Sequence, residues 1–118
     1  MQCINRVELL GTVVSFRTNF IADKTVSTIH LLTERGYTNK EGVPCLEAQR
    51  HQVVVWDNNG NLRLQELKVN DIVHVTGILT YRKYETSDNQ ERYVSEIKAT
   101  SFQICKPEEN AVLPEMTM

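Results

Sequence analysis

At 118 residues the chain has the length of one small domain, and 41% of its residues are hydrophobic. No apolar run approaches the roughly 18 to 20 residues of a membrane-spanning helix, and the N-terminus lacks the regions of a secretory signal, so we expect a cytoplasmic protein. The formal net charge of −2 argues against a uniformly basic nucleic-acid binder. This acidic excess lies in residues 106–118, whereas residues 1–105 are neutral.

Three segments rich in β-branched residues alternate in polarity, as strands do. They are residues 6–16, 25–37 and 46–57. In the third segment, Val53 and Val55 share one face, whereas Arg50 and Trp56 share the other. This alternation predicts strands that bury one face and expose the other.

A polar turn at residues 57–61 ends the third segment. Leu62, Leu64 and Leu67 follow at a spacing that fits one short helix, for which Asn61 is the expected cap. Two further strands joined by a polar hairpin loop come next. Their ranges are 72–85 and 92–104, with the loop at 86–90.

Five strands with a short helix between the third and the fourth follow the order of the oligonucleotide-binding fold, an all-β, five-stranded Greek-key barrel. Gly11 and Gly77 interrupt strand patterns, where glycine marks a bulge or a tight bend. Loop 38–44 should project between the second and third strands. We expect residues 1–105 to form this single domain and residues 106–118 to form a short disordered C-terminal tail.

Motifs for catalysis and metal binding are absent from the sequence. Cys3, Cys45 and Cys105 are odd in number and widely spaced, which favours reduced thiols over a disulfide framework. The histidines and cysteines show no ligand spacing, so we expect no metal. There is no phosphate-cradling glycine loop and no nucleophile motif, so we expect neither a cofactor nor an enzyme.

The fourth predicted strand combines aromatic and basic side chains. Arg82 and Tyr84 share one face, just as Arg50 and Trp56 do in the third strand, so each strand can offer one ring and one cation to a common groove. Aromatic rings can stack on bases for about 1–3 kcal/mol each, and cations can bind phosphates. Ordinary cross-strand packing at a barrel edge is the structural alternative.

Five stretches agree in order and spacing with a known family and together span roughly residues 4–105. They are NRVELLG (5–11), LLTERGY (31–37), RHQVVVW (50–56), LKVNDIVHVTGILTYRKY (67–84) and ERYVSEI (91–97). The chain thereby resembles the bacterial single-stranded DNA-binding proteins. In that family, aromatic side chains on the barrel surface stack with bases and basic residues follow the phosphates.

The resemblance implies six nucleic-acid-binding residues. At three of the family's stacking positions this chain keeps an aromatic ring, and at the fourth Arg50 replaces a tryptophan. Arginine could still stack through its planar guanidinium while adding charge. The predicted binding residues are Tyr37, Arg50, Trp56, Arg82, Lys83 and Tyr84.

The family assembles as a homotetramer, which places the histidine matching His51 near subunit contacts and lets the first strand pair subunits. We therefore expect an oligomer interface at His51, Val7 and Leu9, with a dimer left open. Two other readings also stay open. The chain could be a primosomal accessory protein of the same fold, or a protein-interaction barrel without nucleic-acid binding.

One departure from the family concerns the C-terminus. Family members continue through a Gly- and Pro-rich linker to an acidic tip that recruits replication and repair proteins, whereas this chain ends in LPEMTM. We read it as a variant without that linker and tip, so the resemblance does not define partner proteins of this kind. The resulting hypothesis is a nucleoid-associated, sequence-tolerant protein that binds and protects single-stranded DNA during replication, recombination or repair.

Overall fold

The structure is a computed structural model that describes residues 2–105. Five strands close a barrel in the order β1-β2-β3-β5-β4, which confirms the predicted all-β, five-stranded architecture. The strands are β1 (Val7–Ile21), β2 (Lys24–Thr38), β3 (Pro44–Asp57), β4 (Ile72–Glu85) and β5 (Glu91–Cys105). The predicted disordered tail at 106–118 lies outside the described residues.

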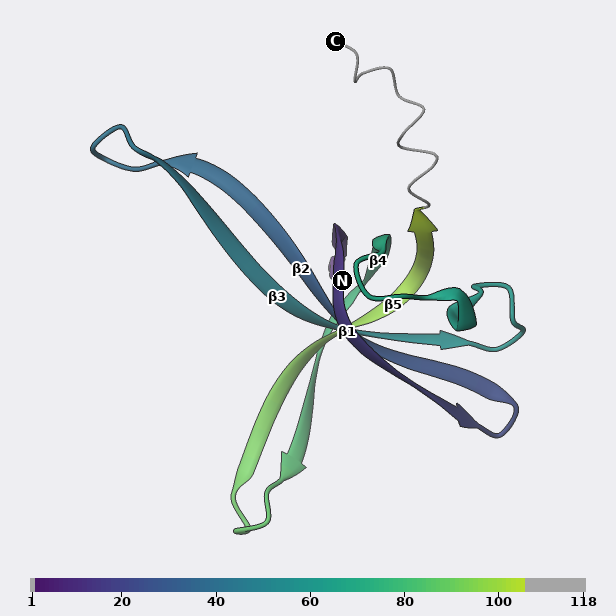
Figure 1. Ribbon diagram of the computed structural model, residues 1–118. Coiled ribbons are helices and arrows are strands. Elements are labelled where there is room, and N and C mark those ends of the chain that lie inside the picture. The colour runs from purple at the N-terminus through teal and green to yellow at the C-terminus, as the bar shows by residue number, and fades with distance from the viewer. Residues whose placement is uncertain (1, 106–118) are drawn as a thin grey trace.

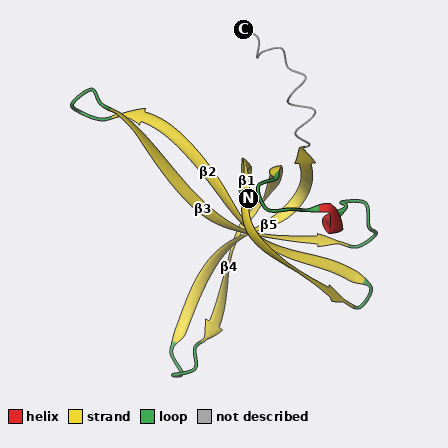
Figure 2. Cartoon of the chain, viewed as in Figure 1, coloured by secondary structure: helices red, strands yellow, loops and turns green. Residues whose placement is uncertain are grey.

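Three hairpins extend beyond the barrel and point in different directions (Figure 1; Figure 2). The β2–β3 hairpin remains paired as far as Thr38 and Pro44, and the β4–β5 hairpin as far as Glu85 and Glu91. The same strands therefore build the closed barrel at one end and an exposed two-stranded arm at the other. Residues on an arm can present both faces to solvent.

β1 is longer than the sequence predicted, because it continues past residue 16 to Ile21. Its last residues pair with β2 across a two-residue turn at Ala22 and Asp23, both with positive φ. Positive φ at both central positions is the type I′ geometry, whose twist matches that of the flanking strands. The Asn-Gly or Asp-Gly signal that usually marks this turn is missing here.

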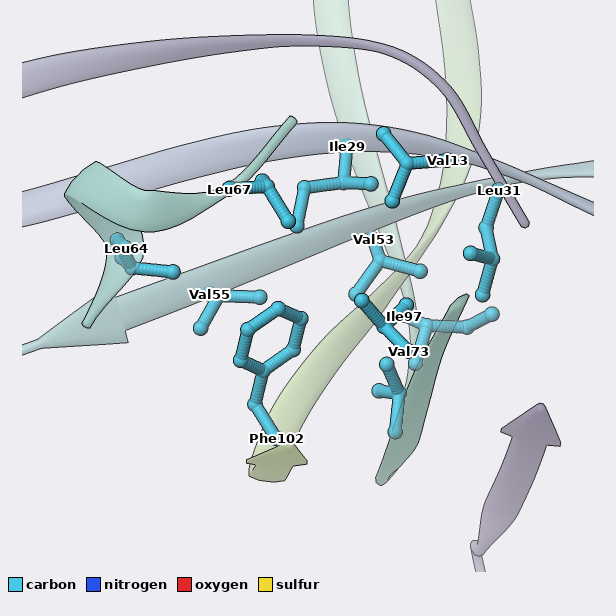
Figure 3. Close-up of a cluster of buried hydrophobic side chains, with 11 residues drawn as sticks. Val13, Ile29, Leu31, Val53, Val55, Leu64, Leu67, Val73, Ile97 and Phe102 are labelled. Carbon is cyan, nitrogen blue, oxygen red and sulfur yellow. The ribbon is translucent and has the colours of Figure 1, made fainter. Parts of the chain in front are cut away.

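Alternating side chains fill the barrel interior (Figure 3). Val53 and Val55 of β3 are buried, as the sequence predicted. Full burial of an aliphatic side chain of this size contributes about 1.5–3 kcal/mol of transfer free energy. The cluster comprises Val13, Ile29, Leu31, Val53, Val55, Leu64, Leu67, Val73, Val75, Ile97 and Phe102.

A β-bulge lets β5 keep its apolar side chains on the core. The register against β4 shifts between Thr76 and Gly77, which leaves Thr100 as an extra residue on β5. The Thr100 hydroxyl donates a hydrogen bond to the Thr76 carbonyl oxygen at 3.1 Å. Because of the extra residue, Ile97 and Phe102 both face the interior although their positions differ in parity.

The two glycines singled out in the sequence lie at close backbone approaches. A Cβ added at Gly77 would lie 2.2 Å from the carbonyl oxygen of Lys98, and one at Gly11 would lie 2.5 Å from that of Leu32. Only a residue without a side chain fits at such distances. The predicted bulge is confirmed at Gly77, which borders the register shift of β4 and β5, whereas Gly11 lies in a regularly paired stretch and is required by the close approach alone.

The predicted helix between the third and fourth strands is only a 3-10 turn, η1 (Leu64–Glu66). Asn61 is not its cap: Arg63 holds that position with φ 57° and makes no capping side-chain bond. The buried carboxylate of Asp57 instead organises the preceding loop, because it accepts hydrogen bonds from the backbone N–H groups of Gly60 at 2.9 Å and Leu62 at 3.2 Å. The side chain that holds this loop thus comes from the end of β3, and η1 itself has no side-chain cap.

Gly77→Ala should lower the free energy of unfolding by about 1–3 kcal/mol, because its methyl group collides with backbone that cannot move independently. Gly36→Ala is the matched control, since a Cβ there meets only the Cys45 carbonyl oxygen at an ordinary 3.9 Å. Urea unfolding of both variants measures the difference. Equal midpoints for the two variants would contradict the close packing at Gly77.

Candidate nucleic-acid interface

The outward faces of β3 and β5 lie side by side and form the floor of the candidate site. The two strands pair in parallel over a short stretch, in which Val54 is opposite Lys98. Trp56 projects from the same side of β3 as Val54 and keeps 42% of its surface exposed. The sequence placed Trp56 and Arg50 on this outward face, and the burial of Val53 and Val55 on the other face confirms that placement.

Trp56 and Arg82 line one hollow of 390 Å³ although they come from different strands. Its other walls belong to β2, β3, β4 and β5, and they are Thr28, Val54, Thr80, Glu96 and Lys98. The fold therefore brings an aromatic ring and a guanidinium to one place, as the sequence predicted for this pair of strands.

Two further hollows adjoin the first. Arg50 and Gln52 line one of 270 Å³ that shares Glu96 with it. Arg17 lines another of 230 Å³, which shares Thr28 with the first hollow and His30 with the second. We call these three adjoining hollows the outer groove. It runs from β1 to β4, and its second hollow is lined on the core-facing side by His51, Leu79 and Ile97.

Glu96 is the one carboxylate that lines the outer groove within the described residues. Arg82 donates to it from Nη2 at 2.9 Å and from Nε at 3.3 Å, and Gln52 donates from Nε2 at 2.6 Å. The Arg82 guanidinium holds the pKa of the Glu96 carboxyl below its usual range, against the opposing effect of burial. The side chain of Glu96 is only 11% exposed and that of Arg82 is 56% exposed, so the groove contains an ion pair with a nearly buried carboxylate and an exposed guanidinium.

Three other cations of the outer groove are exposed and make no ion pair within residues 2–105. They are Arg17, Arg50 and Lys98. Arg17 and Lys98 were missed by sequence reasoning. Arg17 lies in the unpredicted end of β1, and Lys98 reaches the groove only through the parallel pairing of β3 with β5. No pattern within a single strand reveals either one.

Tyr84 lies on the same side of β4 as Arg82, farther along the β4–β5 arm and half-exposed. Lys83 points to the opposite side, where its Nζ forms an ion pair with a Glu91 carboxylate oxygen at 3.0 Å. Tyr93, paired with Lys83, shares that opposite side and is 69% exposed. Of the three predicted residues on this strand, Arg82 and Tyr84 thus point to one side of β4 and Lys83 points to the other.

Tyr37 lies on the β2–β3 arm, away from the outer groove. It pairs with Cys45, which has the parity of His51 and not of Arg50, so the ring belongs to the other side of the hairpin. The guanidinium carbon of Arg35 stands 5.5 Å from the centre of the Tyr37 ring, within the range of a cation–π contact. The structure does not bring Tyr37 together with Trp56.

Two of the three residues predicted for an oligomer interface line another hollow, of 450 Å³, and Val7 does not. His51 and Leu9 both line it, together with exposed Leu10 of β1. The His51 Nε2 atom lies 2.9 Å from the Thr33 hydroxyl, at hydrogen-bond distance. Val7 and Leu9 themselves are partly buried against the core, so Leu10 is the leucine of β1 that faces outward.

The described residues offer little for other kinds of site. No three or more His, Cys, Asp or Glu side chains in residues 2–105 are placed to hold a metal ion together. Cys3, Cys45 and Cys105 are free thiols. In the same part of the chain, no helix is long and apolar enough to cross a membrane.

The chain matches the family described as "Single-strand binding protein family" over residues 4–105. It is 33% identical over 90 residues to "Single-stranded DNA-binding protein 2" of Listeria innocua, an alignment that covers 76% of this chain and 55% of that protein. It is 30% identical over 109 residues to "Single-stranded DNA-binding protein" of Bacillus cereus, covering 88% and 61% of the two chains. The chain therefore spans little more than half the length of these relatives.

Two solved structures have the same fold. One is titled "Plasmodium falciparum SSB complex with ssDNA", with a TM-score of 0.76, 22% identity, and coverage of 90% of this chain and 98% of that chain. The other is a deletion mutant of the single-stranded DNA-binding protein from Thermus aquaticus, with a TM-score of 0.75, 17% identity, and coverage of 88% and 51%. At these identities the likeness establishes the barrel fold and its arrangement of strands.

The lowered pKa of Glu96 predicts how stability should depend on pH. The ionised carboxylate stabilises the folded state above its unfolded pKa, about 4.3, and this contribution is lost as the pH falls through the lower folded pKa. In Glu96→Gln the contribution is absent at every pH, so unfolding midpoints should change less between about pH 6 and pH 3 than in the wild type. Thermal unfolding across this range checks it, and parallel pH profiles would contradict it.

Proposed function

The chain belongs to the Single-strand binding protein family, and from this premise we propose that it binds single-stranded DNA with little sequence preference. The observation that carries the proposal is the outer groove, in which Trp56 and Arg82 line one hollow and Arg50 lines the next. Every base has a flat face that can stack on an aromatic ring, so binding of this kind tolerates any sequence. A strand held in this way cannot pair with its complement.

Different side chains of the groove contact the bases and the phosphates of the strand. The rings of Trp56 and Tyr84 stack bases, and the exposed cations Arg50, Lys98 and Arg17 contact the phosphate backbone. Neutralising phosphates releases condensed counterions, so binding weakens as salt rises. By occupying the strand, the protein protects it during replication, recombination or repair.

We further propose that the chain works as a homotetramer, in which β1 and the hollow at His51 contribute to subunit contact. Support comes from the exposed Leu10, which lies beside Leu9 and His51 at that hollow. Assembly multiplies the DNA-binding face, and linked sites bind with an effective concentration that a lone subunit lacks. This matters for a chain whose net charge is −2.

Titration with an oligo-dT strand should quench intrinsic tryptophan fluorescence, and high salt should weaken the effect. The sequence holds a single tryptophan, so the signal reports on Trp56 alone. Trp56→Ala should weaken binding by about 1–3 kcal/mol, or roughly 5- to 150-fold in Kd, because one stacking surface is lost. Anisotropy of a labelled oligonucleotide measures this variant, which has no tryptophan signal.

The control for this loss is Tyr93→Ala, which removes an exposed aromatic ring from the opposite side of the β4–β5 arm. It should leave the Kd near the wild-type value, and Trp56→Phe should restore much of the affinity. Equal losses in Trp56→Ala and Tyr93→Ala would mean that the outer groove is not the binding face. No binding by the wild type at low salt would favour the protein-interaction barrel instead.

Light scattering after size-exclusion chromatography should give the mass of four chains. Leu10→Glu should shift the protein to smaller species, because it adds a charge to an apolar side chain that is 62% exposed beside the hollow at His51. Leu46→Glu is the matched control, since Leu46 is a similarly exposed leucine, at 68%, on the β2–β3 arm. A wild-type monomer, or an unchanged Leu10→Glu tetramer, would contradict this proposal.

A further inference from the structure

Arg82 differs from the other cations of the outer groove in having a fixed partner. Its guanidinium donates two hydrogen bonds to the Glu96 carboxylate, one to each oxygen. Arg17, Arg50 and Lys98 make no ion pair within the described residues. All four cations line the same groove, and its one carboxylate among the described residues is committed to Arg82.

The two members of the pair differ sharply in exposure. The side chain of Glu96 is 11% exposed, whereas that of Arg82 is 56% exposed. If Arg82 moved to a phosphate, the nearly buried carboxylate would keep the amide of Gln52 as its one hydrogen-bond partner among residues 2–105. Removing one member of such a pair leaves an uncompensated charge in a poorly hydrated place, which is costly. Moving Arg82 to a phosphate would therefore carry this cost, which the unpaired cations Arg17, Arg50 and Lys98 would not incur.

We propose that Glu96 is a positioning residue that keeps Arg82 out of the phosphate contacts and fixes its guanidinium as a flat surface for base stacking beside Trp56. The inference rests on the proposed function and deepens it. A planar guanidinium stacks on flat rings as well as binding anions. With its charge matched by Glu96, the stacking surface at Arg82 attracts bases without adding to counterion release.

The groove then contains two kinds of contact with different responses to salt. Arg50, Lys98 and Arg17 form salt-sensitive contacts, because each releases counterions when it meets a phosphate. The Arg82–Glu96 pair, together with the Trp56 ring in the same hollow, forms a contact that is insensitive to salt. The slope of log K against log salt concentration distinguishes the two kinds, since it counts phosphates and ignores stacking.

The test measures oligo-dT binding at several salt concentrations for the wild type and five variants. Arg50→Gln, the positive control, should make the negative slope shallower by about 0.7, the value of one phosphate contact on a single strand. Arg82→Gln should weaken binding at every salt concentration and leave the slope unchanged. Glu96→Gln should steepen the slope by about 0.7, because Arg82 becomes free to bind a phosphate. The double variant Arg82→Gln/Glu96→Gln should return to the wild-type slope.

Glu91→Gln controls for the change in net charge, because Glu91 pairs with Lys83 on the other side of the arm. It should leave the slope unchanged. If the slope became as shallow in Arg82→Gln as in Arg50→Gln, the proposal would be overturned. This comparison does not depend on how well Glu96→Gln folds. An unchanged slope in folded Glu96→Gln, checked by circular dichroism, would also overturn it. A wild type that binds no oligonucleotide would instead refute the proposed function.

Discussion

The short parallel contact between β3 and β5 is the constraint on which both the core and the outer groove depend. Only two pairs define it, Val53 with Ile97 and Val54 with Lys98. The first pair faces inward and both of its members are buried, so it belongs to the core. The second pair faces outward, where both residues line the hollow at Trp56. The same strand contact therefore closes the barrel and forms part of the groove.

The lengths of the strands also determine where the outward side chains lie. Every strand of the barrel continues into an arm, and alternation along it assigns each side chain to one face. On β4 the outward residues are Arg82 and Tyr84, and Lys83 between them faces the other way. A bulge lets one strand direct residues of different parity into the core. The extra residue Thr100 does this for Ile97 and Phe102 of β5. Position along a strand thus determines function as much as residue type does.

The strands and the inward residues could be predicted because hydrophobic alternation reports on burial directly. Val53 and Val55 were assigned to the core, and Trp56 to the outside, from one strand alone. The rest depended on contacts between segments far apart in the sequence. The pairing of β3 with β5 places Lys98 in the groove, and the register of β2 with β3 places Tyr37 outside it. The loop before η1 is held by Asp57, and the predicted cap Asn61 has no such role. Patterns within a segment carry no information about such partners.

The distribution of ion pairs reconciles a neutral body with a proposed polyanionic ligand. Within residues 2–105, carboxylates neutralise Arg35 and Lys83 on the two arms, away from the outer groove. In the groove itself only Arg82 is paired, and three cations remain available there. A chain can therefore present a positive face without a positive net charge, provided that its acidic residues are placed against the cations of the other faces. Glu96 is the one carboxylate of the described residues that lies inside the groove. Because it is nearly buried and paired with Arg82, it repels the DNA strand little.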